Sequence, residues 1–139
     1  MLVGWSAPFT SVLADGVVFH GVANNSSLDV NPRPGEIDTV ATREFRHSGK
    51  NLYRGQSQPV AEGKALYQAR CQACHLPGGR GGVGPSLITN EPLYPRVATD
   101  AGLFEIIYGG ASGSMQPFSI QGLRQDSMLK IMAYIRSLK

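Results

Sequence analysis

The sequence predicts a mainly helical fold, with three or more helices wrapped around one covalently bound haem. Cys71 and Cys74 stand three residues apart and are followed directly by His75, which is the spacing of a c-type haem attachment site. Several later segments repeat apolar residues every three or four positions, as amphipathic helices do. The 17 glycines and 9 prolines fall mostly outside those segments, so we expect long Gly/Pro-rich loops around a rigid prosthetic group.

A length of 139 residues suits a single domain. We expect a haem-binding core over residues 59–139 and a wrapping arm over residues 15–58. Within the arm, residues 16–20 are compatible with a short strand, and residues 39–47 are compatible with a short helix. Three residues of that helix are expected to face inward: Val40, Phe45 and the aliphatic stem of Arg43.

Residues 1–14 are apolar and small, and Val12-Leu13-Ala14 resembles a signal-peptidase site. A basic n-region is missing, however, and Gly4 and Pro8 interrupt the apolar run. Two interpretations stay open, namely the remnant of an export signal and an ordinary N-terminal extension. No stretch reaches the roughly 18 apolar residues that a membrane span needs.

Two helices of the core are expected to pack closely on each other. Residues 61–70 predict a helix that leads into the cysteines, with the first helical signals at Pro59. Its Gly63 and Tyr67 form a small and aromatic pair on one face, which lets another helix approach. The C-terminal helix predicted for residues 124–138 carries an apolar stripe that needs such a partner.

A third helix is predicted for residues 100–108. Thr99 or Asp100 suits its N-cap, and Gly109-Gly110 suits its C-terminal end. The long connections at 76–98 and 109–122 are expected to cover the two faces of the haem, because loops of that length in a small domain usually have a function.

The residue pattern of the haem motif gives each side chain a role. On a helical turn, Cys71 and Cys74 lie on one face and can form thioethers, while His75 falls beneath the iron. An imidazole bound to iron through one nitrogen hydrogen-bonds through the other, and the Pro85 carbonyl is the candidate acceptor. A redox disulfide is disfavoured because such cysteines usually begin a helix, whereas these follow one. A zinc site is disfavoured because it needs four ligands, and the chain has only two Cys and three His.

Met115 is the candidate for the second axial ligand of the iron. It lies in a loop, 40 residues after His75 (115 − 75), whereas Met128 and Met132 fit the apolar stripe of the C-terminal helix. An open site, or ligation by His20 or His47, stays an alternative.

Two residues of the loop at 76–98, Tyr94 and Arg96, could neutralise the haem propionates by charged hydrogen bonds. Arg80 lies in the same loop and is expected to be an exposed, solvated arginine.

The formal charge of +3 comes from basic residues that are scattered singly along the chain. Without a cluster of basic residues or interleaved aromatics, the sequence does not indicate a nucleic-acid-binding protein. An acidic patch on a protein partner fits this charge better.

The haem motif, the Gly84-Pro85-Ser86-Leu87 stretch, the Met115 loop and the terminal helix pair resemble those of a class I cytochrome c. Residues 18–139 are similar to the cytochrome cL family, the electron acceptors of PQQ-dependent methanol dehydrogenases, of calcium or lanthanide type. The similarity is carried by four further segments: residues 49–55, 93–95, 98–104 and 107–115.

The resemblance implies a periplasmic, monomeric one-electron carrier that is not an enzyme. It would carry one haem c, oxidise a PQQ-dependent alcohol dehydrogenase in methanol oxidation, and reduce another cytochrome c or an oxidase. Two features depart from the family: Ser114 stands where many members have a second Met, and this chain is basic where many are acidic. The first departure favours Met115 as ligand, and the second leaves the identity of the dehydrogenase open.

Electron transfer requires one haem edge near the surface. We expect the docking face around Cys71, Gln72, Cys74, Gly113 and Ser114. Two other functions stay open from the residues alone. One is a haem enzyme or gas-binding sensor with an open sixth coordination site, and the other is a thiol protein without haem.

Overall fold

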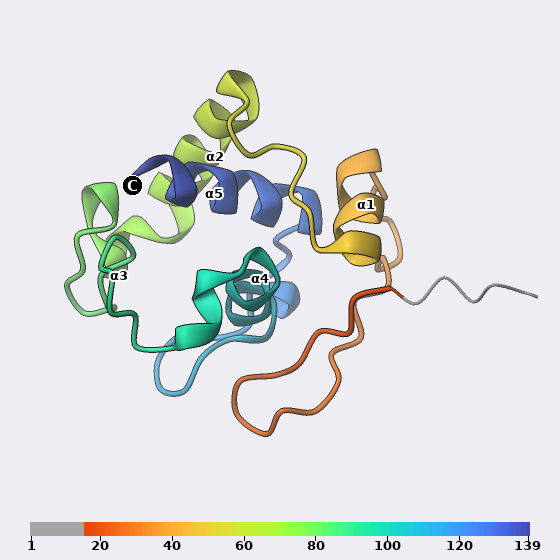
Figure 1. The fold of residues 1–139 in the computed structure, drawn as a ribbon, viewed down its shortest axis with the longest axis horizontal. Coiled ribbons are helices and arrows are strands. Elements are labelled where there is room, and N and C mark those ends of the chain that lie inside the picture. Colours follow the sequence, from red (N-terminus) through yellow and green to blue (C-terminus); the bar gives the residue numbers. More distant parts are fainter. Residues whose placement is uncertain (1–15) are drawn as a thin grey trace, which may run out of the picture.

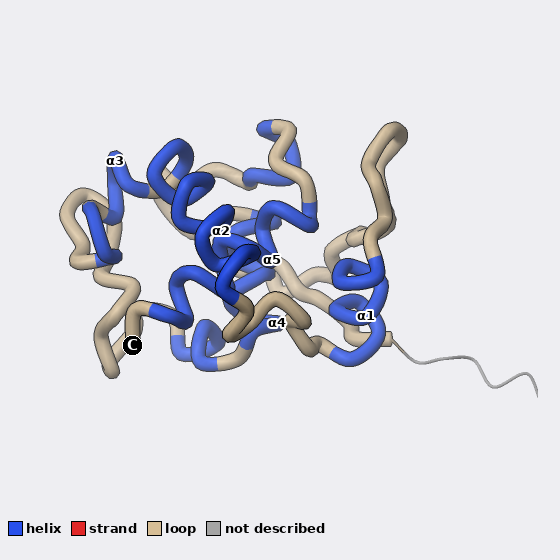
Figure 2. The backbone as a smooth tube through the Cα atoms, turned by 90° about the horizontal axis from the view of Figure 1, so that it is seen from above, coloured by secondary structure: helices blue, strands red, loops and turns tan. Residues whose placement is uncertain are grey.

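The computed structural model describes residues 16–139, and every regular element in this range is helical (Figures 1 and 2). The predictions made for residues 1–14 lie outside the described residues. Eight elements follow one another: α1 (Val40–Ser48), α2 (Ser57–Arg70), α3 (Gln72–His75), η1 (Pro77–Gly79), η2 (Pro95–Ala98), α4 (Asp100–Gly109), η3 (Phe118–Gln121) and α5 (Gln125–Ser137). None of the described helices is both long and apolar enough to cross a membrane.

Helices α2 and α5 form the predicted close pair, and they lie side by side in Figures 1 and 2. A Cβ atom added at Gly63 would overlap the carbonyl oxygen of Lys130, so only glycine allows this approach of the two backbones. Helix α2 begins at Ser57, two residues before the predicted start, because a proline such as Pro59 is tolerated in the first turn of a helix.

The core lies along α5, whose Met128, Leu129, Ile131 and Met132 have no exposed surface. The assignment of Met128 and Met132 to core packing is therefore confirmed. These side chains pack with the aromatic residues of the arm and of α4 in one hydrophobic cluster.

Helix α4 begins and ends as predicted, within one residue. The Thr99 side chain accepts a hydrogen bond from the Gly102 backbone N–H at 3.0 Å, which makes Thr99 the N-cap. Gly110, at φ 80°, ends the helix. A Cβ atom at Gly102 would overlap the Arg96 carbonyl oxygen, so α4 packs directly against η2.

The strand predicted for residues 16–20 is wrong. A single isolated bridge joins His20 to Ser27. The segment is held instead by burial of Phe19 and by separate backbone hydrogen bonds, such as the one from the Val17 N–H to the Arg46 carbonyl at 2.9 Å. Phe19 is 1% exposed, with its ring 5.6 Å from that of Phe45 and 5.2 Å from that of Phe104. Burial of one aromatic residue and a few separate backbone hydrogen bonds therefore hold the start of the arm without a sheet.

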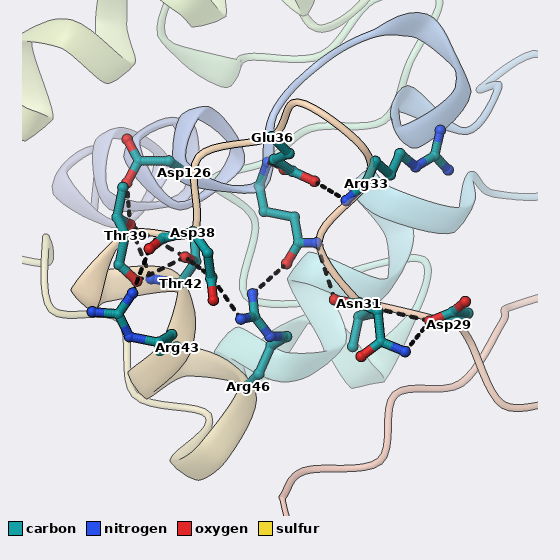
Figure 3. Close-up of polar contacts among 12 residues, drawn as sticks. Asp29, Asn31, Arg33, Glu36, Asp38, Thr39, Thr42, Arg43, Arg46 and Asp126 are labelled. Carbon is teal, nitrogen blue, oxygen red and sulfur yellow. Dashed lines mark hydrogen bonds and ion pairs between the residues drawn. The ribbon is translucent and has the colours of Figure 1, made fainter.

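Polar contacts fasten the next part of the arm to the start of α5 (Figure 3). The Gln125 backbone N–H donates to the Glu36 carboxylate at 2.6 Å, and the Gln125 side chain donates to the Val30 carbonyl at 3.1 Å. The Tyr108 hydroxyl of α4 donates to the Asp29 carbonyl at 2.7 Å. The arm is thus packed along both helices.

Helix α1 forms where predicted, but two of its three expected inward residues face outward. Val40 is 66% exposed and Arg43 is exposed, whereas Phe45 is buried together with Ala41 and Thr42. The face is set by contacts around Asp38, which accepts hydrogen bonds from the Thr42 hydroxyl and, through its carbonyl, from Arg43. These contacts turn Arg43 toward the preceding loop and leave Val40 in solvent.

Candidate haem site

Cys71 lies at the break between α2 and the single turn α3, with φ −121° and ψ −30°. The Cys71 carbonyl accepts hydrogen bonds from the Cys74 N–H at 3.2 Å and from the His75 N–H at 2.9 Å. The two thiols therefore stand one turn apart at the end of a helix, as the sequence predicts. Both are free cysteines, Cys74 exposed and Cys71 half-buried.

Burial raises the pKa of the Cys71 thiol to about 11. At neutral pH this group is a protonated thiol, not the low-pKa thiolate of a redox dithiol. The described residues also contain no group of three or more His, Cys, Asp or Glu side chains that could hold a metal ion. Neither the disulfide-exchange nor the zinc alternative gains support from the structure.

His75 is 9% exposed, and its Nδ1 atom lies 2.8 Å from the Pro85 carbonyl oxygen. Because a carbonyl can only accept, Nδ1 carries the proton and donates it, which leaves Nε2 as the basic nitrogen. This is the contact that the sequence predicted for Pro85. An oriented, buried imidazole with a basic nitrogen fits the role of a metal ligand.

The loop after His75 closes on the imidazole through glycine. A Cβ atom at Gly84 would lie 2.7 Å from Cε1 of His75, so a larger residue would displace the ring. The Gly84 N–H donates to the Cys74 carbonyl at 2.9 Å, which ties this loop to the cysteine motif. Gly84 was not singled out as a site residue in the sequence, because a single glycine in a Gly-rich loop carries no distinguishing signal.

Leu76, directly after His75, has φ 63° and ψ 163°. Residues other than glycine rarely adopt this conformation, which costs about 1–3 kcal/mol. The Leu76 carbonyl accepts a hydrogen bond from the Tyr67 hydroxyl at 2.6 Å. The sequence pointed to Tyr67 only as a packing residue of α2, since nothing in the spacing of the two residues indicates this bond.

Met115 lies in the loop between α4 and η3 and is half-buried against the hydrophobic core. Its carbonyl accepts a hydrogen bond from the Ala111 N–H at 3.1 Å, which closes a short turn. A Cβ atom at Gly110 would lie 2.9 Å from the Met115 carbonyl oxygen. The local fold therefore fixes the backbone at Met115, and its thioether is of the chemical type that haem iron accepts.

Arg96 has a partner that the sequence did not indicate. Its Nη1 atom donates to Glu105 Oε2 at 3.0 Å and to the His20 carbonyl at 3.1 Å, and Glu105 also accepts from the His20 N–H at 2.7 Å. Glu105 is only 8% exposed. This partly buried ion pair joins the arm, η2 and α4, so Arg96 has a structural role apart from the predicted propionate contact.

The remaining candidates lie in less constrained surroundings. Tyr94 is half-buried at the start of η2. Arg80 is exposed, as expected for a solvated arginine, and His47 is exposed on α1. The propionate contacts of Tyr94 and Arg96 stay predictions.

Residues 58–135 match the family model described as cytochrome c oxidase, cbb3-type, subunit III. The fold is similar to the crystal structure of cytochrome cL from Methylophaga aminisulfidivorans, with a TM-score of 0.83 and 36% identity, over 87% of this chain and 80% of that one. It is also similar to cytochrome cL from Hyphomicrobium denitrificans, with a TM-score of 0.81 and 37% identity, over 87% and 73% of the two chains.

The chain belongs to the cytochrome cL family of c-type cytochromes. It is 39% identical to cytochrome c-L of Methylorubrum extorquens over 124 residues. That alignment covers 88% of this chain and 62% of the relative, so the chain spans about three fifths of the relative's length. Family membership confirms the predicted class of fold and implies haem c as the cofactor.

Proposed function

We propose that this protein is a periplasmic, monomeric one-electron carrier, not an enzyme. In this proposal one haem c is attached to Cys71 and Cys74, and its iron is ligated by His75 and Met115. The observation that carries the proposal is the hydrogen bond from His75 Nδ1 to the Pro85 carbonyl. This bond leaves Nε2 of His75 unprotonated, and His75 directly follows the second of two free cysteines.

Haem c supplies a one-electron couple when it is bound. The residues around the site would hold the two proposed ligands in the same positions in both oxidation states, so that little reorganisation would accompany electron transfer. The Pro85 carbonyl fixes the tautomer and orientation of His75, and the turn closed by Ala111 holds the Met115 backbone. The packed helices α2 and α5 provide a rigid support for both segments.

The proposed docking face lies around Cys71, Gln72, Cys74, Gly113 and Ser114, of which Cys74, Gly113 and Ser114 are exposed. The chain has no Asp or Glu between Glu62 and Glu91, or between Glu105 and Asp126. All the proposed haem ligands fall in these two acid-free segments. The basic residues of the segments are Lys64, Arg70, Arg80 and Arg124, and each of them is exposed.

Such a face suits an electron donor with an acidic patch. We propose that the donor is a PQQ-dependent alcohol dehydrogenase, in particular a methanol dehydrogenase, and that the acceptor is another cytochrome c or an oxidase. The cytochrome cL relatives support this assignment. Tyr94 and Arg96 are proposed to contact the propionates.

The test begins with protein matured in a periplasm that can attach haem. A Soret band and a mass increase of one haem, both lost in the Cys71→Ala Cys74→Ala variant, are expected. Stopped-flow mixing with purified calcium-type and lanthanide-type PQQ dehydrogenases should then show rapid reduction by at least one of them. Reduction by neither would remove the proposed donor, while absence of the Soret band would remove the haem assignment itself.

A further inference from the structure

We propose that the Tyr67 hydroxyl positions His75 by holding Leu76 in its strained backbone conformation. This inference rests on the proposed function, because it concerns the histidine that we assign as an axial ligand. It gives a buried tyrosine, nine residues from the leucine it contacts, a role in setting the properties of the iron site.

The conformation of Leu76 needs an external contact to persist. Among the described residues, only Asn25 and Leu76 have positive φ without being glycine. Asparagine tolerates this region well, but a leucine with φ 63° and ψ 163° occupies a region that is essentially reserved for glycine. A strained residue beside a functional side chain is retained only where its surroundings determine it.

Tyr67 supplies that contact from a fixed position. Its side chain has no exposed surface, and its ring packs 5.2 Å from the ring of Tyr134 on α5, at an interplanar angle of 58°. Gly63, one turn earlier on α2, brings the two helices together. The hydroxyl therefore projects from the close contact between α2 and α5 to the Leu76 carbonyl, 2.6 Å away.

The strained residue directs the chain toward the acceptor of the His75 proton. The His75 carbonyl accepts a hydrogen bond from the Gly81 N–H at 2.9 Å, and the Leu76 carbonyl accepts one from the Gly79 N–H at 3.1 Å. These bonds shape the turn that returns to Pro85. A rotation at Leu76 would move this turn, and with it the carbonyl that binds His75 Nδ1.

The chemical consequence concerns the basicity of His75. A strong Nδ1–H bond to a carbonyl makes an imidazole a better electron donor to a metal. Weakening this bond disfavours the ferric state, so the midpoint potential should rise. A hydrogen bond that only stabilised the fold would lower stability without this shift.

The experiment compares Tyr67→Phe with Tyr134→Phe in the haem-loaded protein. Both variants remove a hydroxyl from the same aromatic pair, but Tyr134 donates no side-chain hydrogen bond to the described residues. We expect Tyr67→Phe to raise the midpoint potential. We also expect the His75 Nδ1 proton, followed by NMR, to exchange with solvent about tenfold faster, which is the effect expected when one hydrogen bond that stabilises the site is lost. We expect Tyr134→Phe to change neither, and equal behaviour of the two variants would overturn the inference.

A second pair of variants tests the strain itself. Leu76→Gly and Leu76→Ala both remove the side chain, but only glycine adopts the native φ freely. We expect Leu76→Gly to unfold at a higher denaturant concentration than Leu76→Ala. We also expect Tyr67→Phe to shift the midpoint potential less when Leu76 is replaced by Gly than when Leu76 is present. Equal stability of the two Leu76 variants would contradict the inference, even if Tyr67→Phe failed to fold.

The two proposals fail in different ways. If the native protein does not attach haem, the proposed function is wrong. If it attaches haem with His75 as ligand and Tyr67→Phe behaves as Tyr134→Phe does, only the positioning role is wrong.

Discussion

At the scale of single residues, buried hydrogen bonds decide which groups can act as ligands. Pro85 fixes the proton of His75 on Nδ1, so the residue presents Nε2 and no other nitrogen. Burial keeps Cys71 protonated, with a pKa of about 11.

Met115→Ala should lower the midpoint potential of the haem-loaded protein, on the order of 100 mV, because a thioether ligand raises the potential of haem iron. The reduced variant should also bind carbon monoxide rapidly, since it has an open position. Met132→Leu serves as the control, because Met132 is fully buried on α5 and should change neither property. Unaltered spectra and potential in Met115→Ala would show that another residue is the ligand.

Asp126 at the start of α5 is the centre of a set of partly buried contacts. It accepts hydrogen bonds from the Tyr53 hydroxyl at 2.5 Å and the Thr39 hydroxyl at 2.8 Å, and it lies 3.2 Å from Lys130 Nζ. Burial alone would raise the pKa of Asp126, but these donors and the lysine charge outweigh it and hold the pKa below its ordinary value. The carboxylate thus joins the α1 cap, the segment before α2, and α5.

A lowered pKa makes the stabilisation by Asp126 pH-dependent. The stabilising effect is complete above the unfolded pKa of about 3.9, and it is lost as the pH falls through the lower folded value. Asp126→Asn should lower the free energy of unfolding by on the order of 1–3 kcal/mol at pH 7, and this difference should shrink below about pH 4. Denaturant titrations at pH 7 and pH 3 measure it, and a difference that stayed constant with pH would contradict the assignment.

At the scale of the elements, the contact between α2 and α5 is the main constraint on the fold. It places the end of α2, and therefore Cys71 and His75, relative to the core. Helix α4 is held in the same manner, because Gly102 allows η2 to lie against its first turn. Two glycines thus set the distances within two pairs of elements, α2 with α5 and α4 with η2.

Gly63→Ala should lower the free energy of unfolding by about 1–3 kcal/mol, because the added methyl group overpacks the helix contact. This would occur although alanine is the better helix former. Gln68→Ala on the exposed side of α2 is the control and should stay within about 0.5 kcal/mol of the native protein. A Gly63→Ala protein as stable as the control would show that α2 and α5 are farther apart in solution.

At the scale of the whole molecule, the distribution of charge matters more than its sum. The net charge is +3, but the two acid-free segments hold four basic residues and all the proposed ligands. Several acidic residues elsewhere are paired with bases, as Asp100 is with Arg136 at 2.8 Å and Glu105 is with Arg96 at 3.0 Å. A positive region around the docking face is the expected result.

Arg70→Glu Arg80→Glu should slow reduction by an acidic dehydrogenase about tenfold or more at low ionic strength, and the difference should narrow as salt is added. Arg43→Glu Lys50→Glu makes the same change in net charge at two exposed residues outside the acid-free segments and is the matched control. Equal slowing in both double variants would indicate that total charge, and not the proposed face, governs the encounter.

Features that depend on short spacings were predictable from the amino-acid sequence. Cys71, Cys74 and His75 predicted the attachment turn, and the apolar repeat predicted α5. The cap and stop residues predicted α4, and Gly63 with Tyr67 predicted a close helix contact on α2. These predictions succeed because helical periodicity and the geometry of one turn are local properties. The contact between His75 and Pro85 could be predicted for the same reason, since only ten residues separate the two.

The tertiary structure alone decided which distant groups meet. It pairs Arg96 with Glu105 and His20, turns Val40 to solvent, holds Phe19 without a strand, and brings Tyr67 to Leu76. Contacts of this kind join segments that each have several acceptable conformations when alone. The choice among those conformations follows from burying the aromatic cluster and pairing every buried polar group at the same time, and no short stretch of sequence specifies that outcome.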